Sequence, residues 1–207
     1  MQPFATVLDW QQGTITPHDN IVVRRLGDMK AMYHDQAAVA RLLAAGDPLL
    51  YEVYEVHMPS EAGHLNHCCS IIYPGLVGDE YFMTKGHYHA VEGTAEIYLG
   101  LQGQGMLLMQ TREGQVSHID FRPGVMAYIP PYWAHRMINT GPERFIFLGV
   151  YPGNAGHNYG TIEQTGFARL VVERNDAPAI VPNPSSDRRG VVACPAVFSG
   201  ATPGGST

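Results

Sequence analysis

The sequence is short of charge, of cysteine and of long apolar runs. Asp, Glu, Lys and Arg make up 15% of the 207 residues, and the formal net charge is −6. The few Lys and Arg residues are scattered, which argues against a surface for nucleic acid or for an anionic membrane. No apolar run approaches the ~20 residues that span a bilayer, and the first residues lack the pattern of a secretion signal. We therefore expect a cytoplasmic protein without nucleic-acid or membrane partners.

The three cysteines, Cys68, Cys69 and Cys194, do not make a disulfide framework. Their number is odd, and adjacent cysteines cannot readily bridge each other. No C-x2-C pair is present that would indicate a zinc site. We interpret these residues as small buried hydrophobic side chains.

Turn residues between short apolar stretches are abundant. Hydrophobic residues make up 45%, and 23 Gly and 15 Pro accompany them, a balance typical of short strands and turns. One helix or two short ones are expected within 26–45, since Asp35 can cap a helix over 35–45 and Gly46 can end it. We expect a mainly β domain over 1–184, with N-terminal strands and this helix, and a C-terminal tail or arm over 185–207. Strands are predicted near 4–8, 21–24, 49–57, 67–73, 99–110, 116–121, 125–129, 135–139, 144–151 and 167–174.

Two histidines, His87 and His89, stand two residues apart. Side chains alternate along a strand, so both imidazoles face the same side. The pair Glu92-Gly93 reads as a turn, after which a second strand can bring Glu96 back beside the histidines. His135 is a fourth candidate ligand. Three neutral imidazoles and one carboxylate suit a first-row divalent metal with open coordination positions for chemistry.

Residues at fixed spacings extend this pattern. The first motif, H-x-H-x6-E-x6-G, ends at Gly103. A second motif, G-x5-P-x4-H-x3-N, is formed by Gly124, Pro130, His135 and Asn139. Together they resemble the two-motif signature of the cupin superfamily, which implies a double-stranded β-helix, or jelly-roll, barrel.

Two departures from the general cupin pattern indicate a subfamily. The interval from His89 to Glu96 is longer than is usual in cupins, and Tyr132 stands where many cupins carry Gly. The sequence around both positions resembles the cupin-type glucose-6-phosphate isomerases first known from archaea. The resemblance covers about residues 20–184 and is carried by residues 73–98, 128–139 and 145–161.

The resemblance implies a metal-dependent isomerase that interconverts glucose 6-phosphate and fructose 6-phosphate, in glycolysis and gluconeogenesis. It implies one divalent metal per subunit, with Fe²⁺ expected and Mn²⁺, Ni²⁺ or Zn²⁺ as alternatives. By analogy with cupins of this size, we expect a homodimer.

The family's site residues carry over to matching positions. The metal ligands would be His87, His89, Glu96 and His135, and the catalytic residues Glu96 and His157. The substrate would contact Tyr51, Ser70, Thr84, Gly86, Tyr98, Tyr151 and Tyr159.

Two neighbouring positions are not expected to act on the substrate. Thr94 lies where archaeal members tend to carry a basic residue, so no charge contact is expected from that side. Lys85 is interpreted as a scaffold or rim charge without a catalytic role.

Alternatives remain at this stage for both mechanism and function. Hydrogen can pass between C1 and C2 as a proton, through a cis-enediol with a carboxylate base, or as a hydride. Three His and one Glu on Fe²⁺ also suit a cupin dioxygenase, and a non-catalytic sugar-binding cupin is a further possibility. The many hydroxyl groups among the expected substrate contacts favour the phosphosugar, and a complete ligand set favours turnover.

Overall fold

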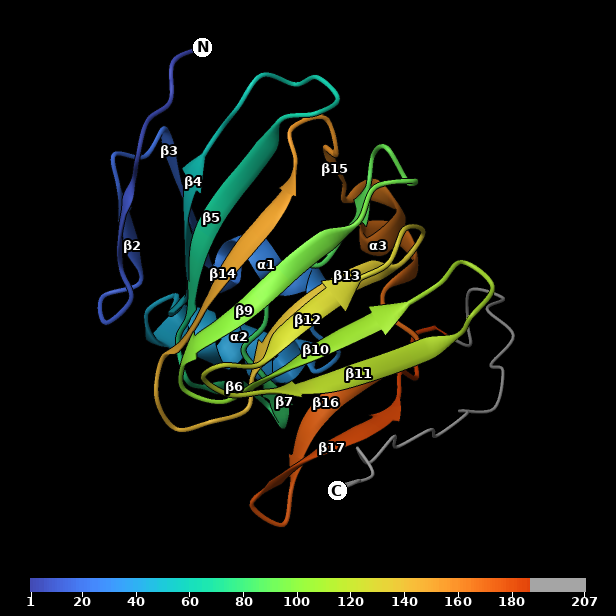
Figure 1. Ribbon diagram of the computed structural model, residues 1–207. Coiled ribbons are helices and arrows are strands. Elements are labelled where there is room, and N and C mark those ends of the chain that lie inside the picture. Colours follow the sequence, from blue (N-terminus) through green and yellow to red (C-terminus); the bar gives the residue numbers. More distant parts are fainter. Residues whose placement is uncertain (187–207) are drawn as a thin grey trace, which may run out of the picture.

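Two antiparallel β-sheets that face each other build the main body of the protein (Figure 1). The computed structural model describes residues 1–186. The larger sheet has the order β12-β9-β14-β5-β4-β3, with β12 Met126–Ile129, β9 Glu96–Gln102, β14 Phe145–Pro152, β5 Leu65–Ile72, β4 Leu49–Val56 and β3 Asn20–Arg25. The smaller has the order β11-β10-β13, with β11 Val116–Phe121, β10 Gly105–Gln110 and β13 Ala134–Asn139.

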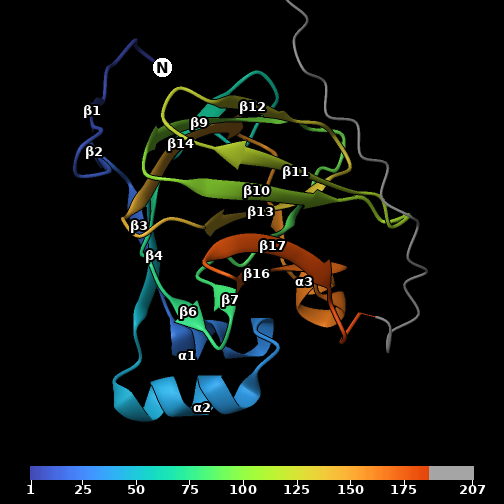
Figure 2. The same ribbon diagram turned by 90° about the horizontal axis from the view of Figure 1, so that it is seen from below.

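Smaller sheets complete the architecture. A four-stranded sheet, β17-β16-β7-β6, lies beyond β10 and β13, on the side away from β9 and β14 (Figure 2). Its strands are β17 Ala177–Pro182, β16 Arg169–Arg174, β7 Glu80–Tyr81 and β6 Leu76–Val77. Two further pairs are β15 His157–Asn158 with β8 Tyr88–His89, and β1 Val7–Asp9 with β2 Thr14–Thr16. The predicted mainly β fold is confirmed.

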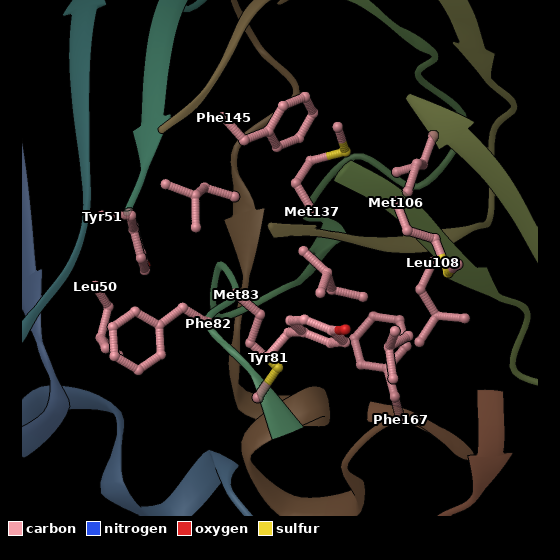
Figure 3. Packing of buried hydrophobic residues seen from close by; sticks show 14 of the residues in the cluster. Leu50, Tyr51, Tyr81, Phe82, Met83, Met106, Leu108, Met137, Phe145 and Phe167 are labelled. Carbon is pink, nitrogen blue, oxygen red and sulfur yellow. The ribbon is translucent and has the colours of Figure 1, made fainter. Parts of the chain in front are cut away.

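The core fills the space between the two facing sheets. Phe145 of β14 is fully buried, and its ring lies 6.1 Å from that of Phe121 on β11 and 5.4 Å from that of Phe147. Figure 3 shows Phe145 above Met137 of β13, and Met106 of β10 belongs to the same cluster of buried side chains. Alternation along each strand directs these side chains inward, so a single set of contacts fixes both sheets.

The helices are short and few within residues 1–186. They are α1 Leu26–Met29, the 3₁₀-helix η1 Lys30–Met32, α2 Gln36–Ala45 and α3 Gly160–Thr165. The predicted helix is confirmed as α2: the Asp35 carboxylate accepts a hydrogen bond from the Ala38 N–H at 2.8 Å, and the Gly46 N–H donates to the Leu42 carbonyl at 3.1 Å. No helix in this part of the chain combines the length and the apolar character that a membrane crossing requires.

Two elements at the C-terminal end were not predicted. Residues 167–174 were expected to be the last strand, but β17 follows β16 and pairs with it over six residues. The prolines at its two ends concealed it, and they are tolerated because β17 is an edge strand. Helix α3 was not predicted, because Gly and Thr are poor helix formers. The expected tail over 185–207 falls outside the described residues except for Ser185 and Ser186.

The structure gives physical reasons for three motif residues that bind no metal. Gly103 has φ +74°, and a Cβ there would lie 2.4 Å from the Arg144 carbonyl oxygen, so no side chain fits. Gly124 has φ +87° in the turn before β12. The Asn139 amide donates to the carbonyls of Ile72 and Glu143, at 2.9 and 2.7 Å. These residues therefore hold the strands that carry the predicted metal ligands.

Replacing Asn139 with alanine is expected to lower the free energy of unfolding by about 2–4 kcal/mol. Asn139 is fully buried, and its side-chain oxygen also accepts the Gly141 N–H at 2.9 Å, so the change leaves three backbone groups without partners. Urea unfolding measures the effect. Asn20→Ala is the matched control, since Asn20 is exposed and makes one side-chain hydrogen bond, to Glu55. Equal effects of the two substitutions would contradict this role for Asn139.

Candidate metal centre

Four side chains converge between the two main sheets: His87, His89, Glu96 and His135. One possible ligand atom from each lies within 4.8 Å of those of all the others. Glu96 Oε2 is 3.2 Å from His89 Nε2 and 3.1 Å from His135 Nε2. Apart from His87, which is partly exposed, all are buried. The structure thus brings together all four predicted ligands.

Backbone pairing explains this convergence. His87 and His135 form an antiparallel bridge, in which each N–H donates to the other's carbonyl, at 3.2 and 3.1 Å. His89 ends β8, and the predicted turn at Glu92-Gly93 returns the chain to Glu96, the first residue of β9. The ligands therefore sit on strands whose register is fixed by the sheet.

A hydrogen bond behind His89 orients its ring. His89 Nδ1 lies 2.8 Å from the Thr94 hydroxyl oxygen and 3.1 Å from the Thr94 carbonyl oxygen. Thr94 itself donates its hydroxyl hydrogen to the Val91 carbonyl at 2.6 Å, so its oxygen can only accept from His89. Nδ1 therefore carries the proton, and Nε2 is left as the donor atom for a metal.

Replacing Thr94 with valine is expected to weaken metal binding by about tenfold, because the hydrogen bond that orients His89 is lost while the shape is kept. The Thr94 carbonyl can still accept the Nδ1–H of His89. The loss of metal affinity is therefore expected at the low end of the range of about 10- to 100-fold for such orienting residues. Competition with a fluorescent chelator measures the affinity. Thr111→Val, which removes a buried hydroxyl just after β10, is the control. An unchanged affinity in Thr94→Val would contradict the orienting role.

The charges of the cluster suit a divalent cation. Burial, together with the nearby His135, His157 and His89, holds the pKa of His87 well below its ordinary value, so the ring is neutral. Burial alone would raise the pKa of Glu96, but the interactions of its carboxylate with His135 and His89 outweigh burial, so the net pKa is lowered.

His87 Nε2 provides an independent indication of a ligand. This nitrogen is buried and has no hydrogen-bond partner among residues 1–186. A lone pair without a partner, next to a carboxylate and two further imidazoles, matches the coordination preferences of a first-row divalent metal ion. The residues present therefore fit such an ion.

The cluster opens into a pocket. Three of the four candidate ligands line it, together with His157 and all seven predicted substrate contacts: Tyr51, Ser70, Thr84, Gly86, Tyr98, Tyr151 and Tyr159. Strand pairing places Val53 beside Ser70, and Ser70 beside Phe147. The pocket thus combines a metal centre with several hydroxyl groups.

The phenols of the pocket are neutral hydrogen-bond donors. Burial raises the pKa of Tyr51, Tyr98, Tyr151 and Tyr159 above the ordinary range. For Tyr98 the negative charge of Glu96 adds to this effect. Each phenol therefore keeps its hydrogen at neutral pH and can donate it to an anionic ligand.

His157 lies at the rim of the pocket. Strand β15 pairs with β8 and sets His157 opposite His89. Its ring is 4.4 Å from that of His87 and stacks on Tyr159 at 5.5 Å. The ring is exposed at the surface, yet desolvation by the surrounding chain lowers its pKa. Imidazole in this position is neutral and able to accept a proton.

Five pocket residues besides Lys85 were not among the predicted site residues: Val22, Val53, Glu55, Cys68 and Phe147. Glu55 stands on the same face of β4 as Tyr51 and Val53, and Cys68 precedes Ser70 by two residues on β5. Strand alternation from the expected residues could therefore have found both. Lys85 is a rim charge, as predicted, because its ammonium group forms an ion pair with Glu163 and lies 5.0 Å from the centre of the Tyr159 ring.

Comparison with known proteins identifies the relatives of this chain. Residues 23–183 match the family model described as Glucose-6-phosphate isomerase (GPI). The chain is 47% identical to the glucose-6-phosphate isomerase of Thermococcus litoralis over 183 residues, which are 88% of this chain and 96% of that protein. The chain belongs to the glucose-6-phosphate isomerase family. The isomerase of Pyrococcus furiosus is 45% identical over the same shares.

A bacterial relative extends the glucose-6-phosphate isomerase family beyond archaea. A "Putative glucose-6-phosphate isomerase 2" of Rhizobium meliloti is 34% identical over 172 residues, or 83% of this chain and 86% of that protein. Among solved structures, an oxalate decarboxylase is similar with a TM-score of 0.43 and 18% identity, over 53% of this chain and 27% of that one. The mainly β architecture and the spacing of the two motifs agree with the resemblance to the cupin superfamily.

Proposed function

We propose that this chain is a metal-dependent isomerase that interconverts glucose 6-phosphate and fructose 6-phosphate. The observation that carries the proposal is a cluster of three His and one Glu that opens into a pocket rich in hydroxyl groups, in a chain that belongs to the glucose-6-phosphate isomerase family. We assign residues 1–184 to one catalytic domain. A phosphorylated sugar is charged and does not cross membranes unaided, which supports the proposal of a cytoplasmic location and a role in glycolysis and gluconeogenesis.

The substrate phosphate is assigned to the hydroxyls of Tyr51, Ser70, Thr84 and Tyr151 and to the Gly86 N–H. Neutral phenols with raised pKa values support this, because they donate hydrogen bonds to an anion. Gly86 lines the pocket with φ +76°, and a Cβ there would lie 2.7 Å from the Phe167 ring, so only Gly fits at this position. Tyr98 and Tyr159 are assigned to the sugar.

Glu96 is assigned the transfer of hydrogen between C1 and C2. Its Oε2 atom faces His89 and His135, which leaves Oε1 available to take a proton from one carbon and return it to the other. A divalent metal, when bound by the four ligands, would stabilise the negative charge that develops on the two substrate oxygens. His157, neutral and at the rim, is assigned the proton transfer that opens the sugar ring.

Fe²⁺ is proposed as the physiological metal. The ligand set also accepts Mn²⁺, Ni²⁺ and Zn²⁺, so availability in the cell decides the occupant. Elemental analysis of protein purified without oxygen tests the assignment. Iron as the main metal, at one ion per chain, is the expected result, and another metal at that stoichiometry would overturn it.

A homodimer is proposed on the basis of an apolar face on the larger sheet. Ile97 of β9 lies opposite Tyr128 of β12 and Val150 of β14. In the next row, Leu99 lies opposite Met126. Tyr128 and Met126 are 60% and 66% exposed, which is unusual for an outer sheet face without a partner. Light scattering should give twice the chain mass for the wild type and one chain mass for Tyr128→Lys, and a monomeric wild type would refute the proposal.

A coupled assay in the presence and absence of oxygen tests the proposed reaction. Formation of glucose 6-phosphate from fructose 6-phosphate is followed, while an electrode records oxygen. We expect equal turnover under both conditions and no oxygen uptake. Oxygen consumption without isomerisation would point to the dioxygenase, and neither activity to a sugar-binding cupin.

A further inference from the structure

The proposed phosphate site has a charge imbalance. A phosphate monoester carries nearly two negative charges at neutral pH, whereas Tyr51, Ser70, Thr84 and Tyr151 are neutral. The same pocket also contains the carboxylates of Glu55 and Glu96. A divalent metal held by the four candidate ligands would act on the sugar oxygens in the proposed reaction, so it would not neutralise the phosphate. A cation near these hydroxyls would balance this negative charge, and this argument depends on the proposed function.

Lys85 is the single Lys or Arg that lines the pocket within residues 1–186. It lies between Thr84 and Gly86, both assigned to the phosphate. Its side chain is 21% exposed, and its ammonium group contacts the Glu163 carboxylate. The ammonium also lies 5.0 Å from the centre of the Tyr159 ring. These contacts place a positive charge at the rim of the pocket.

Arg24 provides a second positive charge on the opposite side of Tyr51. It lies on β3, directly opposite Tyr51 on β4, and shares a strand face with Val22, which lines the pocket. Its guanidinium donates to the Val23 carbonyl at 3.0 Å and has no carboxylate partner within residues 1–186. Burial raises the pKa of Tyr51 and of Tyr159, and the positive charge of Arg24 opposes this rise at both phenols, which is consistent with its closeness to their hydroxyls.

We propose that Lys85, assisted by Arg24, binds the phosphate dianion of the substrate, and that Glu163 of α3 holds Lys85 when the phosphate is absent. The Glu163 side chain is 46% exposed, so its ion pair with Lys85 is partly solvated and weak. A phosphate that is already held by several hydroxyls forms stronger charge-assisted hydrogen bonds with Lys85 than Glu163 does. The phosphate therefore replaces the Glu163 carboxylate as the partner of Lys85. Lys85 and Arg24 thus set the preference for phosphorylated over neutral sugars.

Calorimetric titration with inorganic phosphate tests the proposal without turnover. Protein stripped with EDTA is used, so that phosphate is not recruited by a metal. We expect Lys85→Gln to weaken phosphate binding by about tenfold and Arg24→Gln by about threefold, as loss of a charge-assisted hydrogen bond predicts. Glu163→Gln should tighten binding by about threefold, because it frees Lys85. Lys30→Gln and Arg41→Gln, at exposed positions, are charge-matched controls that should bind as the wild type does.

Two outcomes would overturn the inference: unchanged phosphate affinity in Lys85→Gln, or weaker affinity in Glu163→Gln. If Lys85→Gln fails to fold, the direction of the Glu163→Gln effect decides. In the isomerase assay, Lys85→Gln should raise KM for fructose 6-phosphate with little change in kcat. A protein that binds phosphate in this pattern but does not isomerise the sugar would refute the proposed function while supporting this phosphate site.

Discussion

His89→Ala is expected to lower kcat/KM for fructose 6-phosphate by at least about 10³-fold, or about 4 kcal/mol. The substitution removes the Nε2 atom that faces Glu96 at 3.2 Å, together with the Thr94 contact that orients the ring. The remaining three side chains bind a divalent ion less tightly. Metal content and the coupled assay, measured on the same preparation, report both consequences.

The control for this prediction is His118→Ala, since His118 is an exposed residue of β11. It should keep wild-type metal content and activity. A His89→Ala protein that retains full activity at wild-type metal content would show that the four-residue cluster is not the reaction centre.

Glu96→Gln is expected to lower kcat by about 10³-fold, within the range for loss of a general base. The amide keeps the shape and an oxygen that can face His89 and His135, but it cannot accept a proton from carbon. Metal affinity should fall less than activity. Glu113→Gln, at an exposed position in the β10–β11 turn, is the matched control.

An isotope experiment separates the two routes that the sequence left open. With wild-type enzyme in heavy water, an enediol path places solvent deuterium on C1 or C2 of the product. A hydride shift carries the original hydrogen across without exchange. No deuterium in the product, together with an active Glu96→Gln, would exclude Glu96 as the base.

Much of the metal centre could be predicted because its signals are local. His87 and His89 share a strand face, and the turn at Glu92-Gly93 brings Glu96 back. His135 could be placed only through the spacing of the second motif, since the bridge between His87 and His135 joins residues far apart in the chain. The fixed spacing of the second motif therefore predicted a contact between distant residues that strand alternation alone does not reveal.

The remainder depends on contacts between distant segments. Nothing near Lys85 in the sequence indicates Glu163, because their pairing requires α3, whose Gly and Thr residues concealed the helix. Because Thr94 stands where archaeal members tend to carry a basic residue, the sequence suggested only that a charge contact is absent there. In the structure, its hydroxyl oxygen accepts the Nδ1–H of His89. Strand β17 was missed because Pro is tolerated at an edge, which only the assembled sheet identifies.

Metal titration of activity tests the central claim most directly. Protein stripped with EDTA is kept without oxygen, Fe²⁺ or Mn²⁺ is added in steps, and turnover of fructose 6-phosphate is plotted against bound metal. The account predicts negligible initial activity that rises in proportion to occupancy and levels off at one ion per chain. Full activity in protein verified to be free of metal, or saturated metal binding without turnover, would contradict it.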